Sequence, residues 1–371
     1  MEYTIDKKEL LMGLHRVQGI VERRTAMPIL ANVLMEAKKG QLVLTATDLE
    51  VGIRASYPAL VLKEGSITVP ARNLYDIIRE TPEGKISFRK KENFWVEIAS
   101  GKAVFNIVGL SAEDYPAIPN YKDKKFFEIA PQDLQEMISK TIFSVSNDET
   151  RYHLNGVFFE KPKKEGDMVR MVATDGHRLS VINKHLDFSK ELSFTRGVII
   201  PRKGLSELKK LLEEEEGKYQ IGFDANNVII KKEKAVLFIR LIEGEYPDYE
   251  QVIPPASKKK ITLNREKFLG ALKRISLLSN ERSRAIKLTA KDNILEISTS
   301  NPEVGEAKEE IEISYHGTAL EVGFNAKYFI DVLNAMESEQ VTIELNDKLS
   351  PGVMKAVGDD NYICVVMPMR I

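Results

Sequence analysis

The sequence predicts an α+β fold built from three similar units, each with two helices packed on a mostly antiparallel sheet. The main observation is an internal repeat, marked by a Thr-Asp or Ser-Asn pair at the end of an apolar strand. Successive pairs are separated by 127 and 126 residues: Thr47-Asp48 in "TATDLEVG", Thr174-Asp175 in "VATDGHRL" and Ser300-Asn301 in "STSNPEVG". Two further markers recur with a similar period. A strand end runs into a helix at Pro70, Pro201 and Asn325, and each unit closes at Tyr115-Pro116, Tyr246-Pro247 or Met367-Pro368.

Each unit opens with a short alternating strand, "YTI", "FEI" or "ITL", that leads into an amphipathic helical pattern. Short runs such as "LVLTATD", "SITVP", "KISFRK", "FWVEIAS" and "AVFNIVG" predict the remaining strands. Helices are expected at 7–18, 72–80, 131–142, 202–212, 264–276 and 325–336. Polar linkers at 120–125 and 254–260 predict three domains, at 1–121, 126–254 and 258–371.

Composition excludes a membrane protein and a disordered chain. Hydrophobic residues make up 43% and charged residues 29%, and no apolar run reaches the roughly 18 residues of a membrane span. The start, "MEYTIDKKELL", lacks the apolar core of a secretory signal, and the single Cys364 allows no intramolecular disulfide. We therefore expect a cytoplasmic protein.

Positive charge is concentrated on the predicted helices. The formal charges of the six predicted helices sum to +7, whereas the whole chain has a net charge of −1. This pattern suits helices that face a phosphate backbone, although surface helices are often rich in lysine without any such role. If helices line a ring, twelve from two chains leave a hole of roughly 28 Å, whereas six leave only about 9 Å. Two chains, and not one, would therefore enclose a DNA duplex.

The chain resembles the bacterial β sliding clamps of DNA polymerase III along its whole length. The resemblance is carried, in order, by "MPIL", "TDLE", "VPAR", "RYHLNGV", "VATDGHRL", "PRKGL", "YPDY", "LSNE" and "VVMPMRI". It implies a head-to-tail homodimer ring of clamp domains that encircles double-stranded DNA without sequence preference. The implied partners are the replicative polymerase catalytic subunit, an ATP-dependent clamp loader and other clamp-motif proteins of repair and replication control. No membrane is implied.

The resemblance also implies a pocket for short partner peptides that contain Gln and Leu or Phe. Its residues would be Leu154, Thr174, Gly176, His177, Arg178, Leu179, Pro247, Val252, Val366, Met367, Pro368, Met369 and Arg370. Adaptable methionines suit a pocket that accepts many partners, with Arg178 and His177 as a polar rim. On the residues alone, "VVMPMRI" is better explained as an ordinary buried edge strand, and only the resemblance favours the pocket.

Matching positions imply DNA contacts and a dimer seam. The DNA-facing residues would be Arg24, Arg72, Arg151, Tyr152, His153, Arg202 and Lys203. Asp148 and His153 differ from the residues of some family members, which makes contact between DNA and the 148–153 loop doubtful. The alternative for Arg24 is a loop arginine with no partner. The seam would join Phe105 and Ile107 to the partner's Leu277 and Leu278, and the acidic segment "NPEVGEAKEE" would add complementary charge. The alternative is that Phe105 and Ile107 are apolar because alternate strand residues pack inward, without any dimer.

Two other functions remain open: a repeat scaffold that binds only proteins, and a hydrolase that uses Asp175 and His177. The hydrolase is disfavoured, because the segment has no nucleophile elbow and the five histidines, at 15, 153, 177, 185 and 316, form no metal-ligand motif. The sequence therefore predicts a non-catalytic protein with no cofactor and no metal.

Overall fold

The computed structural model describes residues 1–22, 26–162, 167–192, 196–213, 218–257 and 259–370. The chain divides into two compact units. The first comprises Met1–Gln132 and Lys203–Leu241, and the second comprises Asp133–Arg202 and Ile242–Ile371. The middle repeat therefore contributes to both units.

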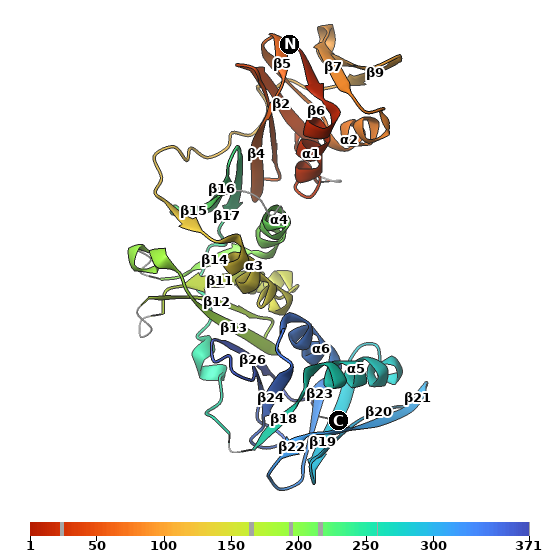
Figure 1. Ribbon diagram of the computed structural model, residues 1–371, viewed down its shortest axis with the longest axis vertical. Coiled ribbons are helices and arrows are strands. Elements are labelled where there is room, and N and C mark those ends of the chain that lie inside the picture. Colours follow the sequence, from red (N-terminus) through yellow and green to blue (C-terminus); the bar gives the residue numbers. More distant parts are fainter. Residues whose placement is uncertain (23–25, 163–166, 193–195, 214–217, 258, 371) are drawn as a thin grey trace. The chain divides into compact units, whose positions relative to one another are not determined.

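Six α-helices occur in the described ranges, two in each repeat (Figure 1). They are α1 (Lys7–Val17), α2 (Ala71–Glu80), α3 (Pro131–Ser139), α4 (Arg202–Leu212), α5 (Arg265–Ile275) and α6 (Ala326–Ala335). Five agree closely with the predicted ranges. The third is shorter than predicted, because α3 ends at Ser139 and the chain continues into a 3₁₀ turn at Ile142–Ser144.

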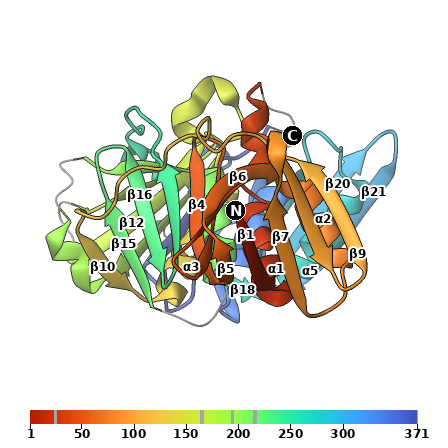
Figure 2. The same ribbon diagram turned by 90° about the horizontal axis from the view of Figure 1, so that it is seen from above.

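The first unit holds two antiparallel sheets, and Figure 2 shows β10, β15, β16 and β4 following one another across the larger one. The eight-stranded sheet has the order β10 (Phe126–Ile129), β15 (Tyr219–Phe223), β16 (Asn227–Lys232), β17 (Ala235–Arg240), β4 (Val51–Pro58), β3 (Gln41–Thr47), β2 (Asn32–Lys38) and β6 (Gly65–Pro70). The five-stranded sheet has the order β5 (Leu60–Lys63), β1 (Glu2–Asp6), β7 (Lys85–Lys90), β8 (Trp95–Ser100) and β9 (Ala103–Val108).

The second unit repeats this arrangement. Its nine-stranded sheet has the order β14 (Val198–Pro201), β11 (Gly156–Glu160), β12 (Met168–Thr174), β13 (Arg178–His185), β26 (Tyr362–Val366), β25 (Gly352–Ala356), β24 (Gln340–Glu344), β18 (Lys260–Asn264) and β22 (Ser314–Tyr315). Its four-stranded sheet has the order β21 (Gly305–Glu312), β20 (Ile294–Asn301), β19 (Ala285–Lys291) and β23 (Leu320–Asn325).

Strand pairing across repeats forms the larger sheets. β17 of the middle repeat pairs with β4 of the first, with Ile239 opposite Val51. β26 of the third repeat pairs with β13 of the middle one, with Val366 opposite Arg178. The C-terminal strand is therefore an internal strand of its sheet, and the alternative of a buried edge strand is wrong. An edge position could not be told from an internal one because both bury apolar residues.

Helix starts and apolar faces follow the sequence pattern. The Asp6 carboxylate caps α1 by accepting from the Lys8 amide (2.9 Å), and Asn264 caps α5 by accepting from the Lys267 amide (3.0 Å). α1 buries Leu10, Leu14 and Val17, and the equivalent face of α5 is buried too. None of the helices in the described ranges combines the length and apolar character that a membrane span requires.

Candidate functional site

A small apolar cavity lies in the second unit where β12, β13 and β26 meet the segment after Tyr246. Its volume is about 190 Å³. Eight of the thirteen predicted pocket residues line it, drawn from four separate stretches of the chain: Leu154, Thr174, Gly176, Arg178, Leu179, Pro247, Val252 and Met367. Asp248, Tyr249 and Val365 complete the lining. Tyr249 belongs to the "YPDY" motif but was not among the predicted pocket residues, and the alternation of β26 places Val365 on the cavity side.

The Thr174-Asp175 pair builds a turn and not a catalytic centre. The Asp175 carboxylate accepts the backbone N–H groups of His177 (2.9 Å) and Arg178 (3.0 Å), and it also accepts from the Arg178 side chain. The Thr174 hydroxyl donates to the Arg178 carbonyl (2.6 Å). Gly176 supplies the positive φ of 89° that this turn needs. Because Asp175 is engaged in this way, it does not hold the His177 ring as a general base would require.

Two tyrosines fix the wall that carries Pro247. Tyr246 stacks on Phe158, with ring centroids 4.9 Å apart, and its hydroxyl accepts from the Thr174 amide (3.0 Å). Burial raises the pKa of Tyr246 well above its usual value, so the ring stays neutral. Tyr249 accepts a hydrogen bond from the buried Arg170 guanidinium (2.9 Å) and donates one to Glu160. Burial is likewise the main cause that raises the pKa of Tyr249.

Arg178 belongs to the wall of the cavity and not to an exposed rim as predicted. Its side chain is only 8% exposed. The guanidinium donates to Asp175 (3.1 Å) and Asp331 (2.7 Å), and it lies over the Tyr328 ring, 4.7 Å from the centroid. The apolar lining therefore contacts a cation whose charge is already compensated.

The other five predicted pocket residues do not line the cavity. His177 is exposed beside it, and Val366 is buried in the sheet opposite Arg178. The tail turns away, since the Met369 amide donates to the Gly323 carbonyl of β23 (2.8 Å). The remaining two, Pro368 and Arg370, belong to the same tail.

The predicted DNA-facing residues differ in how strongly they are held. Arg72 is exposed at the start of α2. Lys203 is ion-paired with the buried Asp48 carboxylate and lies 3.6 Å from Glu22. Burial is the largest single effect on Lys203 and would lower its pKa, but the hydrogen bond to Asp48 and the negative charges of Asp48, Glu22 and Glu50 together outweigh burial, so the pKa is raised. The Arg202 guanidinium donates to the Asn147 side chain. Arg24 lies outside the described residues.

The 148–153 loop is closed around its own acid. Asp148 caps the 3₁₀ turn at Glu149–Leu154, where it accepts from the Thr150 amide (3.0 Å) and from the Arg151 side chain (3.0 Å). The Thr150 hydroxyl, and then the Thr150 amide and Arg151, lower the pKa of Asp148. Tyr152 is 57% exposed beside the half-buried His153. Arg151 is thus partly neutralised before any DNA approaches.

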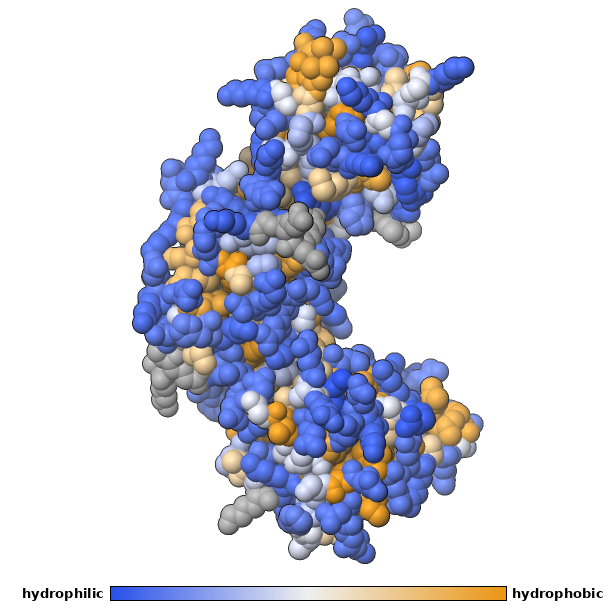
Figure 3. Space-filling view, viewed as in Figure 1, coloured by the Kyte–Doolittle hydropathy of each residue, from blue (hydrophilic) through white to orange (hydrophobic). Residues whose placement is uncertain are grey.

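The predicted seam residues lie at the edges of the two smaller sheets. β9, with Phe105 and Ile107 half-buried on one side, is the edge of the five-stranded sheet. In the second unit, Leu277 is 79% exposed in the 3₁₀ turn Ser276–Leu278 that follows α5. Figure 3 shows exposed apolar surface on this unit near the place of β20 and β21 in Figure 1. Phe105 and Ile107 share the less exposed face of β9, which agrees with the alternative of inward packing as well as with a seam.

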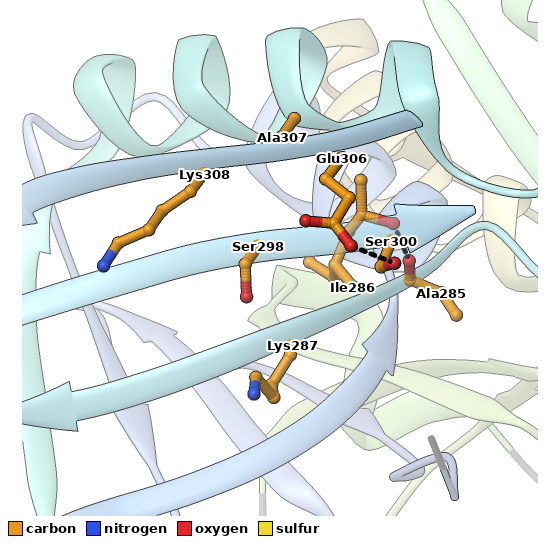
Figure 4. Close-up of a pocket in the computed structure, with 9 residues that line it drawn as sticks. Ala285, Ile286, Lys287, Ser298, Ser300, Glu306, Ala307 and Lys308 are labelled. Carbon is orange, nitrogen blue, oxygen red and sulfur yellow. Dashed lines mark hydrogen bonds between the residues drawn. The ribbon is translucent and has the colours of Figure 1, made fainter. Parts of the chain in front are cut away.

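A larger hollow of about 410 Å³ lies on the outer face of the four-stranded sheet, over β19, β20 and β21 (Figure 4). It is open because small side chains such as Ser298 separate Lys287 from Lys308. Lys308 is paired with Glu296 (2.6 Å), and Ser300 donates to Glu306 (2.9 Å). Its charges satisfy one another, so it offers less to a ligand than the apolar cavity does. Within the described ranges, no group of His, Cys, Asp or Glu side chains is arranged to hold a metal ion.

Comparison with known proteins identifies the family. Models of the DNA polymerase III beta subunit match the chain in three consecutive parts: the N-terminal domain at 1–119, the central domain at 128–248 and the C-terminal domain at 250–370. The chain belongs to the DNA polymerase III beta subunit family.

Relatives and solved structures of this family match over the full length. The beta sliding clamp of Vibrio cholerae is 35% identical over 375 residues, and that of Escherichia coli K12 is 34% identical over 372, each with full coverage of both chains. The DnaN sliding clamp of Bartonella birtlesii, solved with griselimycin, superposes with a TM-score of 0.94 at 35% identity and full coverage of both chains. The DNA polymerase sliding clamp of Bacillus subtilis superposes with a TM-score of 0.94 at 31% sequence identity, and the match covers all of this chain and 99% of that one.

This family member is a DNA sliding clamp of polymerase III and a non-catalytic processivity factor. The predicted fold class, three repeated clamp domains that close as a dimer ring, is confirmed. The hydrolase alternative is excluded, in agreement with the turn built by Asp175.

Proposed function

We propose that the apolar cavity between Leu154 and Met367 is the site at which this clamp holds short Leu- or Phe-containing segments of the replicative polymerase and of other replication and repair proteins. The observation that carries the proposal is the convergence of eight predicted residues on one cavity of about 190 Å³. An apolar hollow of this size accepts one or two aliphatic or aromatic side chains. The half-buried Met367 can repack around partners of different shape.

The finer assignments follow the resemblance. We place the domain boundaries at 1–121, 126–254 and 258–371. We also propose that an ATP-dependent clamp loader is among the partners and that the ring works in the cytoplasm. Arg72, Arg202 and Lys203 are the residues that we assign to the DNA-facing surface, with Arg24, Arg151, Tyr152 and His153 in a secondary role. Ring closure explains how weak phosphate contacts suffice, because topological linkage retains the clamp while salt-sensitive contacts still permit sliding.

The peptide site is tested by titrating the intact protein calorimetrically with a Gln-Leu-Asp-Leu-Phe peptide. Met367→Glu places an unpaired carboxylate in the apolar cavity and should weaken binding by at least about tenfold. Met369→Glu is the matched control, since Met369 lies in the same tail but outside the cavity, and it should change affinity by less than about threefold. A variant truncated before Met367 should not bind.

The affinities of the two methionine variants show where the peptide binds. If both methionine variants bind like the intact protein, the cavity is not the peptide site. If Met369→Glu abolishes binding while Met367→Glu does not, the tail binds partners through another surface. Circular dichroism of each variant confirms that the loss is not caused by unfolding.

Ring function is tested by retention on DNA. Protein loaded on a nicked circular plasmid should remain bound through gel filtration at about 0.5 M salt and should leave after the plasmid is linearised. A protein-only scaffold would show no retention on the closed circle. Arg72→Gln should shorten retention on linear DNA at low salt while leaving retention on the circle intact, since the topological link does not depend on one phosphate contact.

A further inference from the structure

A second hollow, of about 360 Å³, lies in the first unit beside the Thr47–Gly52 turn. Its walls are the turn, the segment Pro116–Pro119 and the ends of β16 and β17. Its apolar lining includes Leu49, Val51, Ile118 and Phe238, and Ile118 packs against the small core cluster that contains Phe238.

The frame of this hollow repeats the frame of the Leu154–Met367 cavity. In the first unit, the Thr47 amide donates to the Tyr115 hydroxyl (3.2 Å), as the Thr174 amide donates to the Tyr246 hydroxyl (3.0 Å) in the second. The two threonines are 127 residues apart, and the tyrosines open the equivalent Tyr-Pro markers. Each wall is therefore held against its turn in the same way.

The strand that closes each space is also equivalent. The Arg240 amide donates to the Glu50 carbonyl (2.7 Å), and the Met367 amide donates to the His177 carbonyl (2.9 Å). Both separations within these pairs are 190 residues, and Arg240 and Met367 are themselves 127 apart. Arg240 thus occupies in the first hollow the place that Met367 occupies in the second.

Side chains, and not backbone, distinguish the two spaces. Leu49 stands where the other turn has Gly176, and it keeps the same positive φ, 80° against 89°. A leucine at positive φ is strained, and this one is also 49% exposed at the mouth of the hollow. A ligand that covers an exposed apolar side chain removes part of the cost of its exposure to water.

The rim has polar groups available for a ligand. The exposed Arg240 guanidinium has no ion pair or hydrogen bond with any described residue, and the same is true of the Asn226 side-chain amide. Glu50, also on the rim, is an exposed acceptor. A cation, an amide and a carboxylate at one mouth match the polar groups of an extended peptide, because backbone N–H and C=O can meet Glu50 and Asn226 while an acidic side chain meets Arg240.

We propose that this hollow binds an extended peptide segment in which an apolar residue is followed by a carboxylate. The apolar side chain would cover Leu49 and contact Ile118, and the carboxylate would pair with Arg240. The site is a second contact for partner proteins, separate from the Leu154–Met367 cavity, and it shares with that cavity only the repeated backbone frame.

The test is a methyl NMR titration of the full-length protein labelled at leucine and methionine methyls. The probe is the peptide acetyl-Ser-Leu-Phe-Asp-Ser-amide, added to about 5 mM, where even a Kd near 1 mM is measurable. Saturable shifts of the Leu49 methyls are expected, with assignment from a Leu49→Ile variant. The Met367 methyl reports the other cavity in the same spectrum, so failure at one site is distinguishable from failure at the other.

Two variants check the chemistry. Arg240→Gln should weaken the Asp-containing peptide by about twofold to fivefold and leave the Asp→Asn peptide unchanged, as expected for an exposed ion pair. Leu49→Gly should weaken the peptide by at least about threefold while leaving thermal stability equal or higher, because glycine adopts the positive φ without strain.

Leu49 methyls that do not shift, or shifts that stay linear to the end of the titration, overturn the proposal. Equal losses for both peptides in Arg240→Gln overturn the carboxylate assignment. A Leu49→Gly variant that loses stability and keeps affinity would show that Leu49 has only a structural role.

Discussion

Arg178 gives the sharpest test of how the Leu154–Met367 cavity is built, because one buried cation ties together three parts of the second unit. Its guanidinium donates to Asp175 in the turn, to Asp331 on α6 and to the Phe143 carbonyl. It also lies over the Tyr328 ring of α6. Arg178→Met keeps much of the apolar volume of the side chain but removes the charge and all donors.

The expected loss in free energy of unfolding is about 3 kcal/mol. Removing one partner of a buried ion pair costs about 3–5 kcal/mol, because the other partner is left uncompensated. The low end applies because both carboxylates keep other donors. Asp175 still accepts the His177 amide (2.9 Å), and Asp331 still pairs with Lys327 (2.8 Å). The lost cation–π contact is worth about 1 kcal/mol, which is smaller than the ion-pair effect and does not change the estimate.

The measurement is urea unfolding followed by circular dichroism, together with peptide titration of the folded variant. Arg240→Met is the matched control, since Arg240 is exposed without a described partner, and it should change stability by less than about 0.5 kcal/mol. Adding Asp331→Asn to Arg178→Met should recover part of the loss, because it removes one orphaned charge. A loss below about 1 kcal/mol for Arg178→Met would refute the view that this cation braces the cavity.

Three other perturbations have defined outcomes. Burial raises the pKa of Tyr115 to about 12. The contribution of the neutral tyrosine to stability is therefore complete below pH 10 and is lost as the pH rises toward 12. In alkaline unfolding curves, Tyr115→Phe should reduce this decline in the free energy of unfolding by up to about 3 kcal/mol. Burial also raises the pKa of Cys364 to about 11, so a thiol reagent at pH 8 should label it only in urea, and rapid labelling of the folded protein would contradict its burial. Leu277→Asp should raise the dimer dissociation constant by about 100-fold in sedimentation, whereas Leu349→Asp, which changes another largely exposed leucine, should leave it unchanged.

The repeat was predictable because its markers are local. Thr47-Asp48 and Thr174-Asp175 each close a turn within five residues: the aspartate accepts nearby amides and the threonine hydroxyl donates four residues ahead. Such turns impose residue types at fixed spacing, and that spacing is visible in the sequence. For the same reason the starts of α1 and α5 were placed to within one residue.

The errors arose where distant residues decide the outcome. Arg178 was expected on a polar rim, but Asp331, 153 residues further along, draws its guanidinium inward. His177 and Met369 match pocket positions of the family, but His177 is exposed in the turn before β13, and the hydrogen bond from the Met369 amide to the Gly323 carbonyl directs the tail away from the cavity. Period and spacing contain no information about partners so far apart, and strand order has the same limitation.

Strand pairing explains why three repeats form two compact units. Each larger sheet is completed by pairing one repeat with the next, through β17 with β4 and through β26 with β13, so the middle repeat is shared between two sheets. The repeats at the ends of the chain have no further neighbour, and their smaller sheets end at β9 and β21. If two chains associate head to tail, β9 of one chain and β21 of the next are the edges that remain to be paired. Joining the five-stranded sheet of one chain to the four-stranded sheet of the next would give nine strands, the same number as in the larger sheet of the second unit. The seam is therefore expected to follow the same rule as the junctions within the chain, with backbone pairing supplying most of the register and Leu277 covering its end.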